Sequence, residues 1–139
     1  MIKVCSNGDR LRGSHPVVPI TPDGLAADAA EGVRAVEVLA SSGFRDSLVR
    51  VLVEVEDADP DVAVAHCWEI EAALDEAGIA APRLHHGEDL ATWAVIDAAL
   101  ERGRDVRIGL EDTLVMADGS PAPSNAALVA EVARRAGAS

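Results

Sequence analysis

The stretch Val106-Arg-Ile-Gly-Leu110, followed at once by Glu111 and Asp112, decides how the rest of the chain is interpreted. A short apolar run between charged residues is typical of a strand that is buried on both faces of a parallel sheet. Ligands of such sheets collect at the carboxyl ends of the strands, which is where the two carboxylates stand. Arg107, four residues before Glu111, completes a candidate reactive cluster. The spacing is equally compatible with structural ion pairs and does not choose between the two roles.

The same alternation of a strand and a helix runs through the whole chain. Expected strands cover 2–5, 48–55, 82–86 and 106–110, and expected helices cover 22–42, 60–77, 90–102 and 124–136. Four such units predict an α/β fold with a parallel sheet and right-handed crossovers. At 139 residues the chain is one domain with a substantial core. It is shorter than the roughly 200 residues of the smallest complete eightfold barrels.

Local signals set the helix starts and the faces that the helices bury. Asp59, followed by a proline, begins the second expected helix, and Ser124 caps the last one. In the third expected helix, apolar residues at helical spacing predict that Trp93, Ile96 and Leu100 face the core.

Charge and cysteine content exclude several classes of protein. The net charge of -12 opposes binding to nucleic acids and to anionic membranes. No signal peptide and no apolar run of about 18 residues is present, and the two cysteines lack a metal-type spacing. We therefore expect a cytoplasmic protein with reduced thiols. Cys67 lies on an apolar helix face and is interpreted as core, while Cys5, near the end of the first strand, either lines the site or is a buried thiol.

Two further strand ends carry side chains that are able to line a site. Glu54 and Glu56 close the second strand, where these paired carboxylates either take part in acid–base chemistry or form an acidic rim. His85 and His86 end the third strand. Because adjacent strand residues point to opposite faces, only one of these histidines can face the ligand side. The two cannot chelate one ion together, as a His-x-His pair would.

The C-terminal third resembles a known family. The segment Val106 to Leu114, then Asp118-Gly119 and Ser124 to Val129, resembles the signature of the β-keto acid cleavage enzymes, the family of 3-keto-5-aminohexanoate cleavage enzyme. The resemblance implies a zinc-dependent (β/α)8 TIM barrel and a transferase. Such enzymes exchange acyl groups between a β-keto acid and acetyl-CoA through retro-Claisen carbon–carbon cleavage, giving acetoacetate and a new CoA thioester.

The resemblance also implies roles for single residues. Glu111 matches a zinc ligand of the family, and Arg107 and Asp112 match the pair that takes the α-proton of the substrate. The other two family zinc ligands come from a His-x-His strand, and no such strand occurs in this sequence. Because catalytic zinc needs about three protein ligands, the chain is expected to bind zinc weakly.

The resemblance covers nearly the whole chain but skips four internal units of the barrel. The four units present match the first, sixth, seventh and eighth, with a deletion seam near Glu31 to Arg34. Since the eighth strand of a closed barrel pairs with the first, we expect a contiguous half-barrel. Its inner face over 48–55 would be uncovered, which predicts a homo-oligomer.

Two functions stay open at this point. The first is a shortened β-keto acid cleavage enzyme that takes a small β-keto acid and a CoA thioester. The alternative is a non-catalytic α/β domain that binds a small anion or a partner protein through its sheet.

Overall fold

The computed structural model describes residues 2–4 and 33–137. Four parallel strands form one sheet in the order β1-β2-β3-β4: β1 (Ile2–Val4), β2 (Val51–Val55), β3 (Arg83–Gly87) and β4 (Asp105–Val106). The helices are a segment over 33–41, α2 (Pro60–Glu76), α3 (Thr92–Glu101) and α4 (Asn125–Arg135), with short 3-10 turns η1 (Arg45–Ser47) and η2 (Asp89–Ala91). The expected α/β class with a parallel sheet is confirmed.

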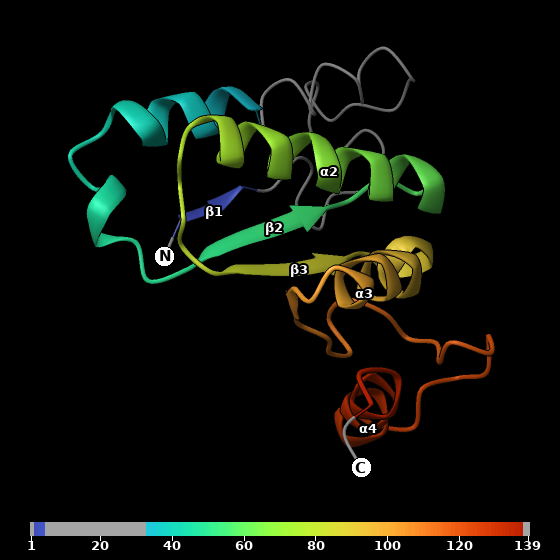
Figure 1. Cartoon of the computed structure of the whole chain (residues 1–139). Coiled ribbons are helices and arrows are strands. Elements are labelled where there is room, and N and C mark those ends of the chain that lie inside the picture. The colour runs from blue at the N-terminus through green and yellow to red at the C-terminus, as the bar shows by residue number, and fades with distance from the viewer. Residues whose placement is uncertain (1, 5–32, 138–139) are drawn as a thin grey trace.

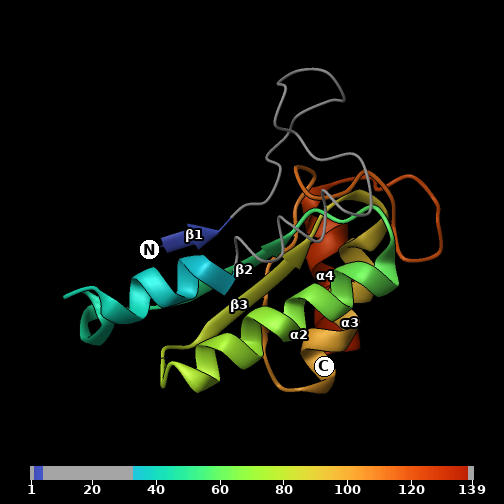
Figure 2. The same cartoon turned by 90° about the horizontal axis from the view of Figure 1, so that it is seen from above.

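The helices are arranged around the sheet in a simple way. The segment over 33–41 and α2 lie over the same face of the sheet, α3 packs along β3, and α4 lies beyond α3 (Figures 1 and 2). The arrows of β1, β2 and β3 point to the same side in Figure 1, so their carboxyl ends share one edge of the molecule. No helix of the described residues is long and apolar enough to cross a membrane.

The core lies between the sheet and these helices. Because side chains alternate along a strand, Val51, Val53 and Val55 of β2 point toward the helices, where they pack with the apolar face of α2. That face contains Cys67, and burial raises the pKa of its thiol to about 12. Cys67 is therefore an inert core residue, as its position on the helix predicts.

The helix starts follow the local signals in the sequence. The Asp59 carboxylate accepts hydrogen bonds from the backbone N–H groups of Asp61 and Val62, and Pro60 occupies the first turn, where a missing N–H is harmless. The Ser124 hydroxyl accepts from the Ala127 N–H in the same way.

The expected bounds of two strands were wrong. β4 contains only Asp105 and Val106, so the run to Leu110 is not a strand buried on both faces. The reason is that β4 pairs with β3 alone among the described residues, and the chain turns away to form the loop around Asp112. β2 begins at Val51 rather than at residue 48.

The buried face of α3 is also rotated from the expected one. Thr92, Val95, Ile96 and Ala99 are buried, whereas Trp93 is half-buried. The Trp93 indole N–H donates to the carbonyl of Val115, which holds the ring at the edge of the core instead of inside it.

The half-barrel interpretation gave a wrong neighbour for β1. It placed the first strand beside the last, but β1 pairs with β2, from Ile2 opposite Val51 to Val4 opposite Val53. Strands that are consecutive along a chain are usually neighbours in space, and this tendency prevails here. The inner face of β2 was expected to be uncovered, but Leu52 on that face is only 6% exposed. Cys5, the part of the first expected helix over 22–32, and the first half of the seam near 31–34 lie outside the described residues.

Candidate active site

A pocket of about 540 Å³ opens at the carboxyl ends of β2 and β3 and over the loop that follows β4. Its lining contains the following residues: Glu54, Glu56, His86, Glu88, Asp89, Arg107, Leu110, Glu111, Asp112, Thr113 and Leu114. The register of the sheet explains why two of them meet, since Glu54 of β2 lies opposite His86 of β3. Both point away from the face that packs against α2.

The backbone of Asp112 is fixed by several hydrogen bonds. Its carbonyl accepts from the Asp89 N–H at 2.7 Å and lies 3.2 Å from the hydroxyl oxygen of Thr92, and its own N–H donates to the carbonyl of Gly109 at 2.9 Å. Thr92 is fully buried at the start of α3. The loop after β4 is therefore tied to α3, which gives the Asp112 carboxylate a defined position.

Gly87 of β3 lies very close to the start of α3, and only a residue without a side chain fits there. A Cβ atom at Gly87 would lie 3.0 Å from Val95 Cγ2 and 3.1 Å from the carbonyl oxygen of Ala91. Both distances are shorter than ordinary contacts, so a larger residue would push the helix away from the strand. The glycine after His86 thus allows β3 and α3 to pack closely beside the pocket.

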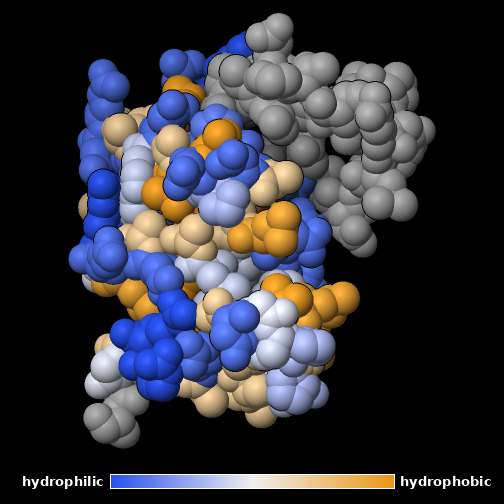
Figure 3. Space-filling model, turned by 90° about the vertical axis from the view of Figure 1, so that its right-hand side faces the viewer, coloured by the Kyte–Doolittle hydropathy of each residue, from blue (hydrophilic) through white to orange (hydrophobic). Residues whose placement is uncertain are grey.

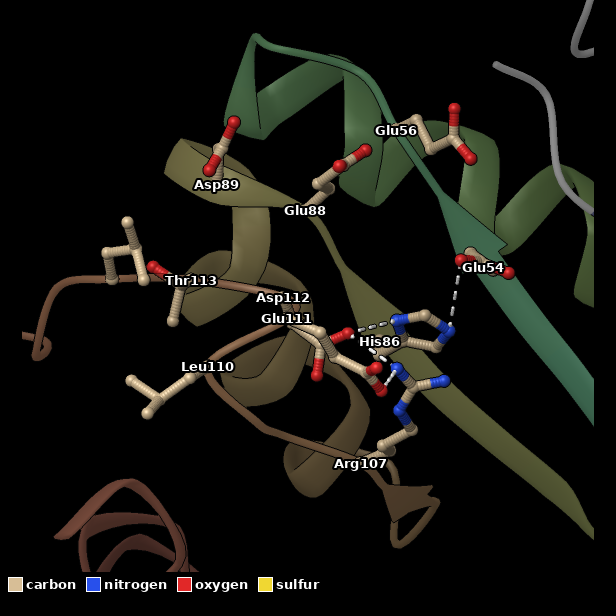
Figure 4. Close-up of a pocket in the computed structure, with 11 residues that line it drawn as sticks. Glu54, Glu56, His86, Glu88, Asp89, Arg107, Leu110, Glu111, Asp112 and Thr113 are labelled. Carbon is tan, nitrogen blue, oxygen red and sulfur yellow. Dashed lines mark hydrogen bonds and ion pairs between the residues drawn. The ribbon is translucent and has the colours of Figure 1, made fainter. Parts of the chain in front are cut away.

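Arg107 joins the two carboxylates that the sequence places after it. Its Nη2 donates to Asp112 Oδ1 at 3.0 Å and also to Glu111 Oε1. Its backbone N–H donates to the carbonyl of His85 at 3.0 Å, which anchors the residue beside β3. The three charged residues that the sequence grouped together are therefore in contact (Figure 4).

His86 lies between two carboxylates in the pocket. Its Nδ1 is 3.2 Å from Asp112 Oδ1 and its Nε2 is 3.6 Å from Glu54 Oε1, and Figure 4 shows the ring between these groups. Its side chain is only 3% exposed. His86 is thus the histidine of the pair that lines the pocket.

His85 lies on the opposite face and belongs to a buried ion-pair network. Its Nε2 is 2.8 Å from Glu71 Oε1, while Glu71 Oε2 accepts from Arg83 and, at 2.6 Å, from Arg104. Burial lowers the pKa of His85, although the hydrogen bond that its ring donates to Glu71 opposes this shift. His85 does not line the pocket, and Cys5 lies outside the described residues.

The described residues do not fit a zinc site. Within 2–4 and 33–137, no three His, Cys, Asp or Glu groups lie close enough together to hold a metal ion. The carboxylate of Glu111, which the resemblance assigns to zinc, is paired with Arg107, and its side chain is 72% exposed. A buried, converging donor set of the kind that zinc needs is not formed by these groups.

The pocket is strongly acidic. Six of its lining residues carry carboxylates, and Arg107 is the permanent cation among them. Figure 3 views the molecule from the edge toward which the strands point, where hydrophobic side chains of the described residues form small separate groups among hydrophilic ones. The lining suits a small polar ligand better than an apolar one.

Sequence reasoning singled out six of the lining residues, Glu54, Glu56, His86, Arg107, Glu111 and Asp112, and missed the other five. Glu88, Asp89 and Thr113 had a detectable signal, since each stands one to three residues from a predicted site residue at a strand end. The neighbours Leu110 and Leu114 had none, because exposed leucines in a loop carry no chemical signature.

Comparison with known proteins gives one finding. A family model described as beta-keto acid cleavage enzyme matches residues 63–139, which is more than half of the chain and includes β3, the loop after β4 and α4. No curated protein matches the chain. Of the pocket residues, Glu54 and Glu56 lie before the matched segment, and the rest lie within it.

Proposed function

This chain belongs to the family of beta-keto acid cleavage enzymes, and we propose that its pocket binds a small β-keto acid and removes its α-proton. The observation that carries the proposal is the contact between Arg107 Nη2 and Asp112 Oδ1, 3.0 Å apart in a pocket at the carboxyl ends of parallel strands. Sheets of this class bind their ligands at that edge.

Arg107 supplies the charge that an acidic substrate needs. Its guanidinium can hold the substrate carboxylate while it remains in contact with Asp112, because a guanidinium has five N–H donors. Six carboxylates line the same pocket, so an anion is held only where Arg107 outweighs their repulsion. Replacement of Arg107 should therefore weaken substrate binding severely.

Asp112 is placed to accept the proton. Its carboxylate is buried, its Oδ1 is held by Arg107, and its Oδ2 has no hydrogen-bond partner among the described residues. A carboxylate in this state can act as a general base toward a C–H group beside a carbonyl. Arg107 beside it would also stabilise the negative charge of the enolate that forms.

The complete reaction that we propose is the acyl exchange of the family. The β-keto acid and acetyl-CoA would give acetoacetate and a new CoA thioester through retro-Claisen cleavage. Because the described residues offer no zinc site, no step of this proposal is assigned to a metal ion. The half-barrel architecture, with four internal units missing, is likewise a proposal for the ancestry of the chain.

The direct test offers the full chain 3-oxopentanoate and acetyl-CoA and follows acetoacetate and propionyl-CoA by mass spectrometry. Formation of both products above the rate in buffer is expected, with loss of the signal in Asp112→Asn. Asp61→Asn, the same chemical change on the exposed first turn of α2, is the matched control and should keep the parent rate.

The same experiment separates the alternative function. Saturable binding of 3-oxopentanoate by calorimetry, without product formation and without exchange of its α-protons for deuterium, would indicate a non-catalytic anion-binding domain. Absence of both binding and turnover in the folded chain would contradict the proposal.

A further inference from the structure

The ring of His86 lies in the pocket in an environment that the proposed roles of Arg107 and Asp112 leave unexplained. Its side chain is buried to 97%, yet neither ring nitrogen has a hydrogen bond of good geometry to any of the described residues. Buried polar atoms are nearly always paired, because an unpaired one has lost its hydrogen bonds to water without gaining others. A buried imidazole in this state, at a pocket wall, points to a partner that it engages when the site is in use.

The nearest partners of the ring are two carboxylates. Asp112 Oδ1 lies 3.2 Å from Nδ1 and Glu54 Oε1 lies 3.6 Å from Nε2. Hydrogen bonds at catalytic sites are often long or poorly aligned without substrate and tighten in the complex. The contact with Asp112 is already within hydrogen-bond distance, so a small rotation of the ring or of the carboxylate would align it as a hydrogen bond.

The two nitrogen donors around Asp112 divide its oxygens unequally. Arg107 Nη2 lies 3.0 Å from Oδ1, and His86 Nδ1 is near the same atom. The other oxygen, Oδ2, is buried without a hydrogen-bond partner among the described residues. Two donors that converge on Oδ1 fix the rotation of the carboxyl group and leave Oδ2 for the substrate.

We propose that His86 is a positioning residue for Asp112, with its Nδ1–H donating to Oδ1 so that Oδ2 faces the α-carbon of the substrate. Glu54, on the neighbouring strand, lies on the other side of the ring, with its Oε1 3.6 Å from Nε2. This inference rests on the proposed function. In the proton transfer, Oδ2 forms the new O–H bond while the electron pair of the broken C–H bond stays on the substrate as its enolate. His86 keeps its own proton throughout.

The position of the ring proton is a property of His86 that can be measured without turnover. Which nitrogen of a neutral imidazole carries the proton is set by the hydrogen bond that this nitrogen makes. The proposal requires a proton on Nδ1, because Nδ1 faces Asp112. A histidine that only fills space would carry its proton on Nε2, the usual position in water, where it would face Glu54.

The test is nitrogen-15 NMR of the histidine rings in the full chain at neutral pH. A protonated Nδ1 of His86 is expected in the parent, and in Asp112→Ala the proton should move to Nε2. His85 is the internal control, because it lies on the other face against Glu71 and its signals should not change. A parent whose His86 carries a proton on Nε2 alone would overturn the proposal. Because the parent spectrum alone shows which ring nitrogen carries the proton, it tests the proposal even if the variant does not fold.

Kinetics give a second, separate readout. With Asp112 less well oriented, His86→Gln should lower kcat by about a hundredfold while KM changes by less than about twofold, because misplacement of about 1 Å has an effect of that size. Added imidazole should restore part of the rate of His86→Ala, which a merely structural role would not allow.

His66→Gln, which lies outside the pocket, is the control and should keep the parent rate. A kcat of His86→Gln equal to that of His66→Gln would contradict the proposal. Lack of turnover in the parent would instead contradict the proposed function. The role of His86 would then be tested by the NMR experiment alone, which needs no turnover.

Discussion

His85 and His86 are adjacent in β3, and their rings lie on opposite faces of the sheet and serve different parts of the molecule. His85 Nε2 is 2.8 Å from Glu71 Oε1 in the layer beneath α2, and His86 Nδ1 is 3.2 Å from Asp112 Oδ1 in the pocket. Side chains alternate between the two faces along a β-strand. Two residues joined by one peptide bond therefore contribute to a structural ion-pair network on one face and to a candidate active site on the other. Substitutions at these neighbours should have distinct effects, on stability in one case and on chemistry in the other.

The first prediction concerns zinc. The isolated chain should bind zinc with little affinity, because Glu111 is paired with Arg107 and no three suitable donors meet among the described residues. Titration calorimetry with zinc at neutral pH measures this. A stoichiometric, submicromolar site that Glu111→Ala abolishes would show that other donors, such as His86, complete a metal centre.

The second prediction concerns the proton-accepting pair. If the chain turns over β-keto acid and acetyl-CoA, removal of either Arg107 or Asp112 should lower turnover by about a hundredfold or more, since general acid–base groups contribute roughly that much. Arg107→Lys is the sharper variant, because it keeps the charge and loses the planar fork of donors. Parent-rate turnover by Asp112→Asn would rule out the assignment of Asp112 as the base.

The third prediction concerns the buried network around Glu71. Glu71→Ala leaves Arg83, whose side chain is 5% exposed, with one buried partner fewer. Breaking a buried ion pair in this way should lower the free energy of unfolding by about 3–5 kcal/mol. Urea denaturation followed by circular dichroism measures the change.

The matched control for this prediction is Glu69→Ala on the same helix. Glu69 is exposed, so its removal should change the urea midpoint little. Equal midpoints for the two variants would mean that the Glu71 ion pairs add nothing to stability.

The fourth prediction concerns the pH dependence of stability. Burial lowers the pKa of His85 in the folded chain below its ordinary value, while the unfolded chain takes up this proton near pH 6.5. Below about pH 6.5 the unfolded state therefore binds more protons, so the free energy of unfolding should decrease as the pH falls toward 5. Urea midpoints at pH 7, 6 and 5 test the trend.

His85→Gln separates the contribution of this residue from that of the carboxylates. Glutamine can still donate to Glu71 but does not titrate, so the decrease between pH 7 and 5 should become shallower. An unchanged slope in the variant would assign the pH dependence to other groups.

The fifth prediction is self-association. The sheet is open, and β1 and β4 have neighbours on one side only among the described residues, so their outer edges offer N–H and C=O groups for pairing. Light scattering from micromolar solutions should give a mass above that of one chain. A single-chain mass over the whole concentration range would mean that these edges are covered. The apolar inner face is a weaker reason than expected, because Leu52 is already buried.

Short-range features of this protein could be predicted from its sequence. The starts of α2 and α4 follow from Asp59-Pro60 and Ser124, because a cap needs only a side-chain oxygen and the N–H groups two or three residues later. The contact of Arg107 with Glu111 and Asp112 is equally local. The placement of His85 and His86 on opposite faces follows from the period of two along any strand.

Only the tertiary structure decided which distant residues meet. It placed Glu54 beside His86 by pairing β2 with β3, and it set β1 beside β2 instead of β4. It also joined the carbonyl of Asp112 to Thr92 at the start of α3. Backbone geometry fixes a periodicity within a few residues. The pairing of strands depends instead on the summed burial and hydrogen bonding of segments far apart in the chain, and no local pattern records that sum.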